Sequence, residues 1–191
     1  MKSNNRQRIL DAGIELFNRS GTVAVTTNHI ARHLKISPGN LYFHFRDREQ
    51  IVRELFKHLT KDTYHAWDPK AKHSVDEFLE KSFEVFWHYR FFHREMYHLR
   101  RQDPALSKAW KSHMRRCMSL LRLNYRQWLK AGLVKPISDD WEMRSLIDTI
   151  LLTSSAYLGF FESPEKPASR KSIRDGINHV QRLLKPYLTS N

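Results

Sequence analysis

The chain has 191 residues, of which 40% are apolar and 28% are charged, a composition typical of a folded globular protein rather than a disordered one. Its single cysteine, Cys117, excludes an intrachain disulfide framework and a four-cysteine zinc site. The formal net charge of +13 favours a polyanionic partner, most often nucleic acid. The N-terminus lacks an apolar signal segment, and the longest uncharged apolar-leaning stretch, residues 150–161, is too short to span a bilayer. We therefore expect a cytoplasmic protein without a membrane partner.

Apolar residues recur with helical spacing along the first 60 residues. Thr26 or Thr27 can cap one short helix, Ser37 followed by Pro38 begins another, and Asp47 can cap a longer one. The stretch between the two short helices is too brief for anything but a tight turn. The pattern predicts helices over about residues 9–17, 27–34, 38–45 and 48–59.

Five further helices are predicted after a break at residues 67–73, over about 75–87, 92–99, 104–131, 141–161 and 173–187. No alternation typical of strands persists for more than three or four residues. The expected fold class is therefore all-α, with about nine helices. We expect two domains: an N-terminal three-helix DNA-binding domain over residues 1–60 and a larger helical domain over residues 61–191, for which the ligand-binding and dimerisation roles are implied only by the family resemblance given below.

The two short helices and the turn between them, about residues 25–44, have the pattern of a helix-turn-helix unit, whose second helix enters the major groove of DNA. The second helix offers Asn40 for bonding a base edge, and Gly39 allows its backbone to approach DNA. The residues expected to contact DNA, at base edges or phosphates, are Thr26, Thr27, Ser37, Pro38, Gly39, Asn40, Tyr42, Phe43, His44 and Arg48.

The segment TTNHIARHLKISPGNLYFHFRDREQIV, residues 26–52, resembles the DNA-binding signature of the TetR family of bacterial repressors. The preceding ILDAGIELF resembles the first helix of that family, so the resemblance covers residues 6 to about 56. Lys35 departs from the glycine usual in the turn, which predicts a non-glycine residue in the left-handed conformation. The stretch FWHYRFFHREMYHLRRQDPAL is similar, with weaker specificity, to a subgroup of bacterial repressors.

This resemblance implies an effector cavity among the later helices, where aromatic residues are frequent. An apolar cavity needs such aromatic walls with a few polar groups, although residues at helical spacing are more often plain core. The residues predicted to line it are Phe83, Phe86, Trp87, Trp110, His113, Met114, Tyr125 and Tyr157.

The resemblance also implies a four-helix interface between two subunits, made by the last two long helices. Apolar residues of the last helix repeat at intervals of four and three, a seam suited to a partner helix, but an intrachain core could use the same stripe. The residues predicted at the interface are Ser154, Tyr157, Ile173, Ile177, Val180 and Leu184.

The resulting hypothesis is a ligand-responsive homodimeric repressor, released from a double-stranded DNA operator by a small apolar or amphipathic effector. The alternative is a small-molecule- or lipid-binding helical protein that turns a basic surface to membranes, although the short capped helix at 38–45 is unlike a membrane-binding helix. No catalytic motif is present, so we do not expect an enzyme, and no cofactor is indicated. The pairs His29 with His33 and His113 with Cys117 have metal-ligand spacing but lack a third nearby ligand, so no metal site is expected.

Overall fold

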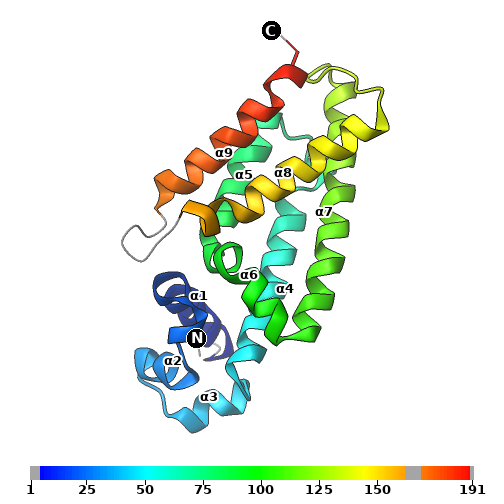
Figure 1. Cartoon of the computed structure of the whole chain (residues 1–191). Coiled ribbons are helices and arrows are strands. Elements are labelled where there is room, and N and C mark those ends of the chain that lie inside the picture. Colours follow the sequence, from blue (N-terminus) through cyan, green and yellow to red (C-terminus); the bar gives the residue numbers. More distant parts are fainter. Residues whose placement is uncertain (1–4, 162–168, 190–191) are drawn as a thin grey trace.

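The computed structural model describes residues 5–161 and 169–189. Within these residues the architecture is all-α, as the sequence predicts (Figure 1). The helices are α1 (Asn5–Ala24), α2 (Thr27–Leu34), α3 (Pro38–His44), α4 (Arg48–Ala66), the 3₁₀ turn η1 (Pro69–Ala71), α5 (Val75–His88), α6 (Arg90–Gln102), α7 (Pro104–Lys130), α8 (Asp140–Phe161), α9 (Arg170–Leu184) and the 3₁₀ turn η2 (Lys185–Tyr187).

The helix-turn-helix unit forms because its residues satisfy the ends of its own helices. Thr26 and His29 make a reciprocal capping box at the start of α2, and the Ser37 hydroxyl accepts the backbone N–H of Asn40 at the start of α3. Lys35 ends α2 with φ 55°, so the turn does use a non-glycine residue in the left-handed conformation. These caps fix the angle at which α3 leaves α2.

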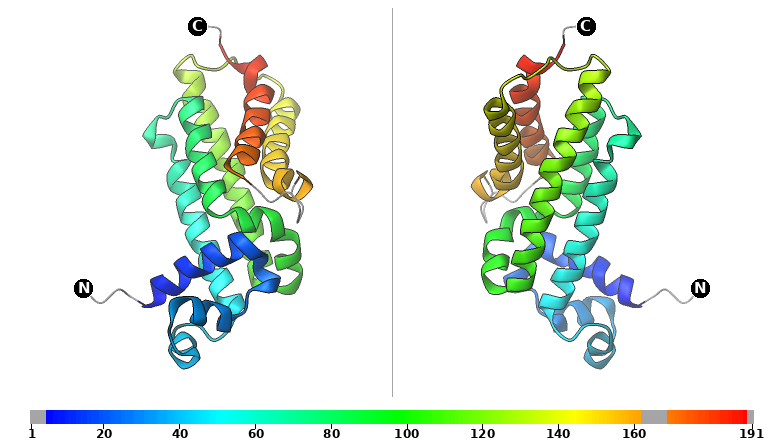
Figure 2. Two further views of the ribbon diagram at one scale, coloured as in Figure 1. Left: turned by 90° about the vertical axis from the view of Figure 1, so that its left-hand side faces the viewer. Right: turned by 90° about the vertical axis from the view of Figure 1, so that its right-hand side faces the viewer.

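Helix α4 joins the helix-turn-helix unit to the rest of the molecule without a break (Figure 2). Asp47 caps its first turn by accepting the backbone N–H of Gln50. Residue 60, where we expected the domain boundary, lies inside this helix. The helical path from the DNA-binding motif into the larger domain is therefore continuous.

The apolar side chains form two core clusters rather than one. The first unites α1 to α4 with α6, from which Phe91, Phe92 and Met96 contribute buried side chains. The second lies among α5, α7, α8 and α9. Helix α6 thus belongs to the core of the DNA-binding part, although it also packs against α7 and α8. Among the described helices, none is both long and apolar enough to cross a membrane.

Candidate nucleic-acid interface

One face of α3 is held by the core, and the other is open to solvent. Leu41 and Phe45 are buried, with 0% and 1% of their surface exposed. Phe43, by contrast, is 85% exposed. The other predicted residues exposed on α3 and at its start are Ser37, Pro38, Gly39, Asn40 and Tyr42, while His44 is half-buried. The helix therefore presents a mixed polar and aromatic face of the kind that can enter a DNA groove.

Two hydrogen bonds position this face. The Thr27 and Tyr42 hydroxyl oxygens lie 3.2 Å apart, which links the start of α2 to α3. The Asn5 side-chain amide donates to the Asn40 side-chain oxygen at 3.3 Å. Sequence reasoning did not single out Asn5, because only the packing of α1 brings residue 5 to residue 40. The neighbouring Thr26 is exposed.

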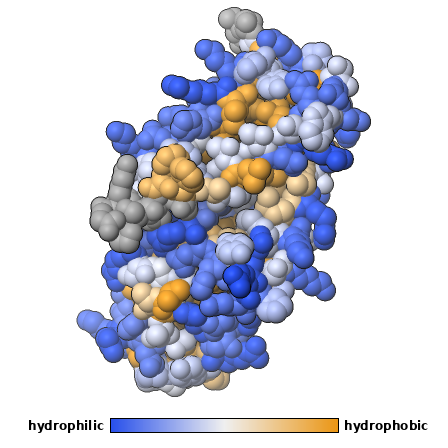
Figure 3. All heavy atoms as spheres, in the orientation of Figure 1, coloured by the Kyte–Doolittle hydropathy of each residue, from blue (hydrophilic) through white to orange (hydrophobic). Residues whose placement is uncertain are grey.

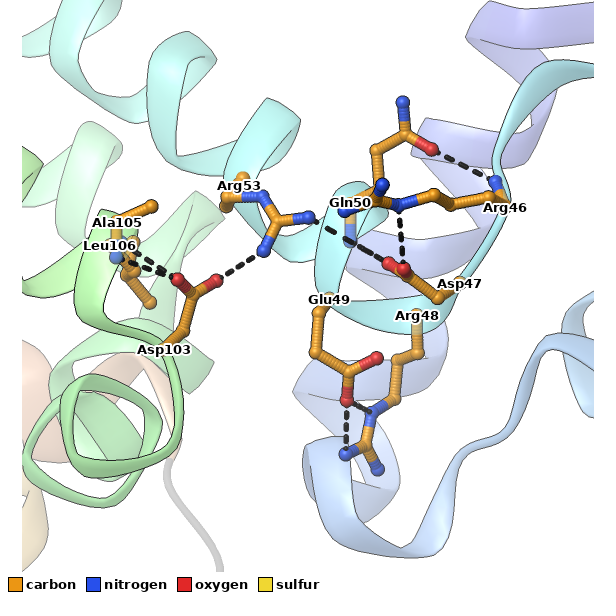
Figure 4. Close-up of polar contacts among 9 residues, drawn as sticks. All are labelled: Arg46, Asp47, Arg48, Glu49, Gln50, Arg53, Asp103, Ala105 and Leu106. Carbon is orange, nitrogen blue, oxygen red and sulfur yellow. Dashed lines mark hydrogen bonds and ion pairs between the residues drawn. The ribbon is translucent and has the colours of Figure 1, made fainter.

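Arg48 is engaged inside the protein rather than presented to solvent. Its guanidinium donates to the Thr22 carbonyl oxygen at 2.7 Å. It also pairs with the Glu49 carboxylate at 2.8 Å (Figure 4). The expected phosphate contact by Arg48 therefore competes with one bond that joins α4 to α1 and with an ion pair inside α4. Lys35, by contrast, is exposed at the turn between α2 and α3.

A polar network ties α4 to the start of α7. Arg53 bonds the Asp103 carboxylate at 2.6 Å and lies 3.8 Å from Asp47, and Asp103 also accepts the backbone N–H groups of Ala105 and Leu106 (Figure 4). Burial raises the pKa of Asp103, but the Leu106 N–H and the Arg53 guanidinium outweigh it and hold that pKa below the ordinary value. The N-caps of α4 and α7 are thus joined through one arginine.

The residues predicted to line an effector cavity are distributed over several places. Trp110 and His113 pack on Phe56, and the His113 ring lies 3.3 Å from the Tyr64 hydroxyl. The Tyr125 hydroxyl accepts the Ile137 N–H at the far end of the bundle. Phe83 and Trp87 lie beneath arginine side chains, and Met114 is half-buried in the second core cluster.

Of these residues, Phe86 and Tyr157 share one small cavity. Its volume is about 20 Å³, and it is lined by Phe86, His93, Ser154, Tyr157, Ile173, Gly176 and Ile177. A second, apolar cavity of about 40 Å³ includes Tyr125 and Leu184 in its wall. In the shapes described, both are far smaller than the roughly 300–1,000 Å³ of a site for a drug-sized molecule. Hollows of about 400 and 550 Å³ lie on the surface, away from the predicted cluster except for Tyr125.

The predicted dimer seam faces inward instead. Ile173, Ile177 and Val180 are 4%, 6% and 2% exposed, because this stripe of α9 packs against α5 and α8 of the same chain. Ser154 and Tyr157 line the small cavity within the chain. The intrachain alternative therefore holds for this stripe, and the exposed apolar residues of α8 and α9 lie elsewhere on these helices.

The outward faces of α8 and α9 carry such residues. Leu152 and Phe160 are 68% and 81% exposed, and Leu183 is 37% exposed. Apolar surface gathers over these two helices in the upper half of the molecule (Figure 3). An exposed apolar patch of this kind is typical of a protein interface.

Comparison with known proteins agrees with the geometry of α2 and α3. Residues 9–55 match a family model described as bacterial regulatory proteins of the tetR family, and residues 52–191 match one described as bacterial transcriptional repressor, TetR. The chain belongs to the TetR family. It is a transcriptional regulator with a helix-turn-helix, and neither its family nor its fold is that of an enzyme.

Individual solved structures and curated relatives show how similar this chain is to other members of the family. A TetR-family transcriptional regulator from Marinobacter aquaeolei VT8 is 32% identical, with a TM-score of 0.86 over 98% of this chain and 92% of that one. The ketosteroid transcriptional regulator KstR2 of Mycobacterium tuberculosis is 18% identical with a TM-score of 0.65, covering 100% and 98% of the two chains, and shares the fold. An HTH-type transcriptional regulator of Staphylococcus aureus strain bovine RF122 is 36% identical over 86 residues, or 40% of this chain. That match spans about half the length of the curated relative, 46%.

Proposed function

We propose that this TetR-family member is a ligand-responsive repressor that acts as a homodimer on a double-stranded operator. The observation that carries the proposal is α3, whose inner face is locked by Leu41 and Phe45 and whose outer face presents Asn40 and Phe43. Residues 1–60 carry ten basic and five acidic side chains, so phosphate attraction supports the same placement. With chromosomal DNA as its partner, the protein would act in the cytoplasm.

A dimer is needed because one α3 contacts only half of an operator. Two recognition helices in successive major grooves lie about 34–36 Å apart, and a two-fold protein then binds a pseudo-palindrome. We assign the subunit contact to the outward apolar residues of α8 and α9, led by Leu152, Phe160 and Leu183. An effector that favours a different separation of the two α3 helices would release the DNA by shifting a two-state equilibrium.

Selection of binding sites from a randomised duplex pool tests the proposal directly. The purified protein should enrich a pseudo-palindromic sequence with half-sites one helical turn apart. Enrichment of no sequence above the starting pool would contradict operator recognition. Binding to anionic vesicles in place of duplex DNA would favour the lipid-binding alternative, which the family assignment does not support.

The role of Asn40 gives a sharper second test. Asn40→Ala should weaken binding to the selected operator by about 1–3 kcal/mol while changing binding to random duplex far less, because an amide reads a base edge rather than a phosphate. Gln127→Ala, an exposed amide on α7, is the matched control and should alter neither affinity. Equal losses on operator and random duplex would remove Asn40 from base recognition.

A further inference from the structure

His93 is a buried polar group without a partner. Both ring nitrogens are inaccessible to solvent, and neither has a hydrogen-bond partner in the described structure. Burial lowers the pKa of His93 to about 4, so the ring is neutral near pH 7 and has one donor and one acceptor to satisfy. Leaving both unsatisfied in an interior costs free energy. The unpartnered ring nitrogens of His93 therefore indicate a hydrogen-bonding molecule in the space beside the ring.

The space beside His93 has the chemistry of a ligand site. The cavity of about 20 Å³ next to the ring is bounded by four apolar or aromatic side chains and by Ser154, whose hydroxyl comes from α8. The Phe86 ring meets the imidazole edge to face at 4.5 Å. No charged side chain lines this cavity. An occupant would therefore meet one imidazole, one or two hydroxyls and otherwise apolar walls.

The opposite side of α6 contacts α1 of the DNA-binding part. The Asn18 side chain of α1 accepts the Phe91 N–H of α6 at 3.1 Å and donates to the carbonyl of His88, the last residue of α5, at 2.8 Å. The Glu95 carboxylate accepts the N–H and the hydroxyl of Thr22. Helix α6 thus lies between His93, which faces α8 and α9, and a set of bonds that fasten it to α1.

From this placement we propose, building on the ligand-responsive function above, that His93 is the polar anchor of the effector. The effector is a small, mostly apolar, uncharged molecule with a hydroxyl group, which can serve as both donor and acceptor for the imidazole. A carboxylate would be buried here without a counter-charge, which is unfavourable. Because the cavity in its described shape has room for about one water molecule, binding requires α6 and α8 to separate. The bonds from α6 to α1 then transmit that displacement to the DNA-binding part.

The test uses three ring compounds that differ in one group: phenol, toluene and benzoate. Binding to the full-length protein is measured by NMR titration, with the ¹⁵N shifts of the His93 ring as the site-specific readout. Phenol should shift the His93 nitrogens and bind at least tenfold more tightly than toluene or benzoate, because a site built to bond a hydroxyl rejects analogues without one. In His93→Leu the preference for phenol over toluene should disappear.

His93→Leu also separates a functional role from a structural one. Replacing an unpartnered buried imidazole with an apolar side chain should leave the thermal midpoint unchanged or raise it, whereas a structural histidine would lower it. Asn124→Leu is the control: it removes a buried polar side chain that has partners, the Trp67 and Leu120 carbonyl oxygens, and should lower the midpoint while keeping the phenol preference.

Two outcomes overturn the proposal. One is equal affinity for phenol and toluene in the wild type. The other is His93 nitrogen shifts that no compound changes, which would assign the cavity to water. Neither outcome affects the proposed repressor, whose DNA binding is measured separately without any compound. Conversely, a failure to select an operator would count against the repressor and leave the titration of His93 interpretable.

Discussion

At the scale of single residues, charged and polar groups in this protein serve mainly to join helices. Arg48 illustrates this: its charge and position suggested a phosphate contact, but its guanidinium bonds the Thr22 carbonyl and Glu49. His29 is also engaged within the protein, since its Nδ1 accepts the Thr26 backbone N–H in the capping box of α2. A basic residue in a DNA-binding domain is therefore not by its nature a DNA contact.

Arg53 provides a prediction at this scale. Arg53→Gln should lower the free energy of unfolding by about 1–3 kcal/mol at pH 7, because it removes a partly buried charge-assisted bond to Asp103. Arg19→Gln, which breaks an exposed pair with Glu15 at 3.6 Å, should cost about 0–0.5 kcal/mol. Urea unfolding of the two variants measures both values.

The same pair predicts a pH dependence. The folded pKa of Asp103 is held below its unfolded value, so this carboxylate adds stability above the unfolded pKa of about 3.9 and loses it as the pH falls through the folded pKa. The gap between wild type and Arg53→Gln should therefore be full at neutral pH and shrink below about pH 4. A gap that stays constant down to pH 2 would contradict an ionised Asp103 as its source.

At the scale of elements, α9 and α8 are in close contact at a glycine, Gly176 of α9. A Cβ placed on Gly176 would lie 2.9 Å from the Tyr157 ring, which is closer than such contacts allow. The helices can approach this closely only because residue 176 has no side chain. Two salt bridges, from Arg170 and Arg174, and one hydrogen bond, from Gln181, join the other side of α9 to α5.

Gly176→Ala should therefore be destabilising, despite the better helix propensity of alanine. Overpacking costs about 1–3 kcal/mol and the propensity gain is at most about 1 kcal/mol, so we expect a net loss of about 1 kcal/mol. Asn178→Ala, at an exposed position two residues along α9, serves as control and should change the free energy of unfolding by no more than about 0.5 kcal/mol. Thermal or urea unfolding of the two variants measures these changes in stability. A stabilised Gly176→Ala would show that α8 and α9 pack more loosely than described.

At the scale of the whole molecule, we expect the outer faces of α8 and α9 to form the contact between subunits. Leu152→Glu should convert the proposed dimer to monomers without unfolding the chain, because Leu152 is 68% exposed in one subunit. Val180→Glu, at a site 2% exposed, should instead unfold the monomer. Sedimentation velocity at micromolar concentration separates the two effects.

Leu123→Glu on α7 is the matched surface control, since Leu123 is exposed on a helix outside the proposed interface. It should leave the sedimentation coefficient unchanged. A wild-type protein that sediments as a monomer at these concentrations would contradict the dimer itself. A dimer that survives Leu152→Glu would instead move the interface to another face.

The local elements of this protein were predictable from the sequence because their causes are local. Caps such as Ser37 and Asp47 act on backbone groups three residues away, and the left-handed Lys35 occupies a turn that the spacing of α2 and α3 requires. The helix-turn-helix motif, its exposed face and the all-α class follow from such short-range rules.

The direction in which each apolar stripe faces was decided only by the tertiary structure. The repeat of Ile173, Ile177 and Val180 suits a partner subunit and an intrachain neighbour equally well, and α5 and α8 of the same chain occupy it. Aromatic residues predicted for one cavity were likewise divided between two cores. Periodicity shows that a face is apolar, but which surface covers it depends on contacts between residues far apart in sequence. His93 and its unpartnered nitrogens emerge for the same reason, because burial is a property of the assembled helices and not of the residue.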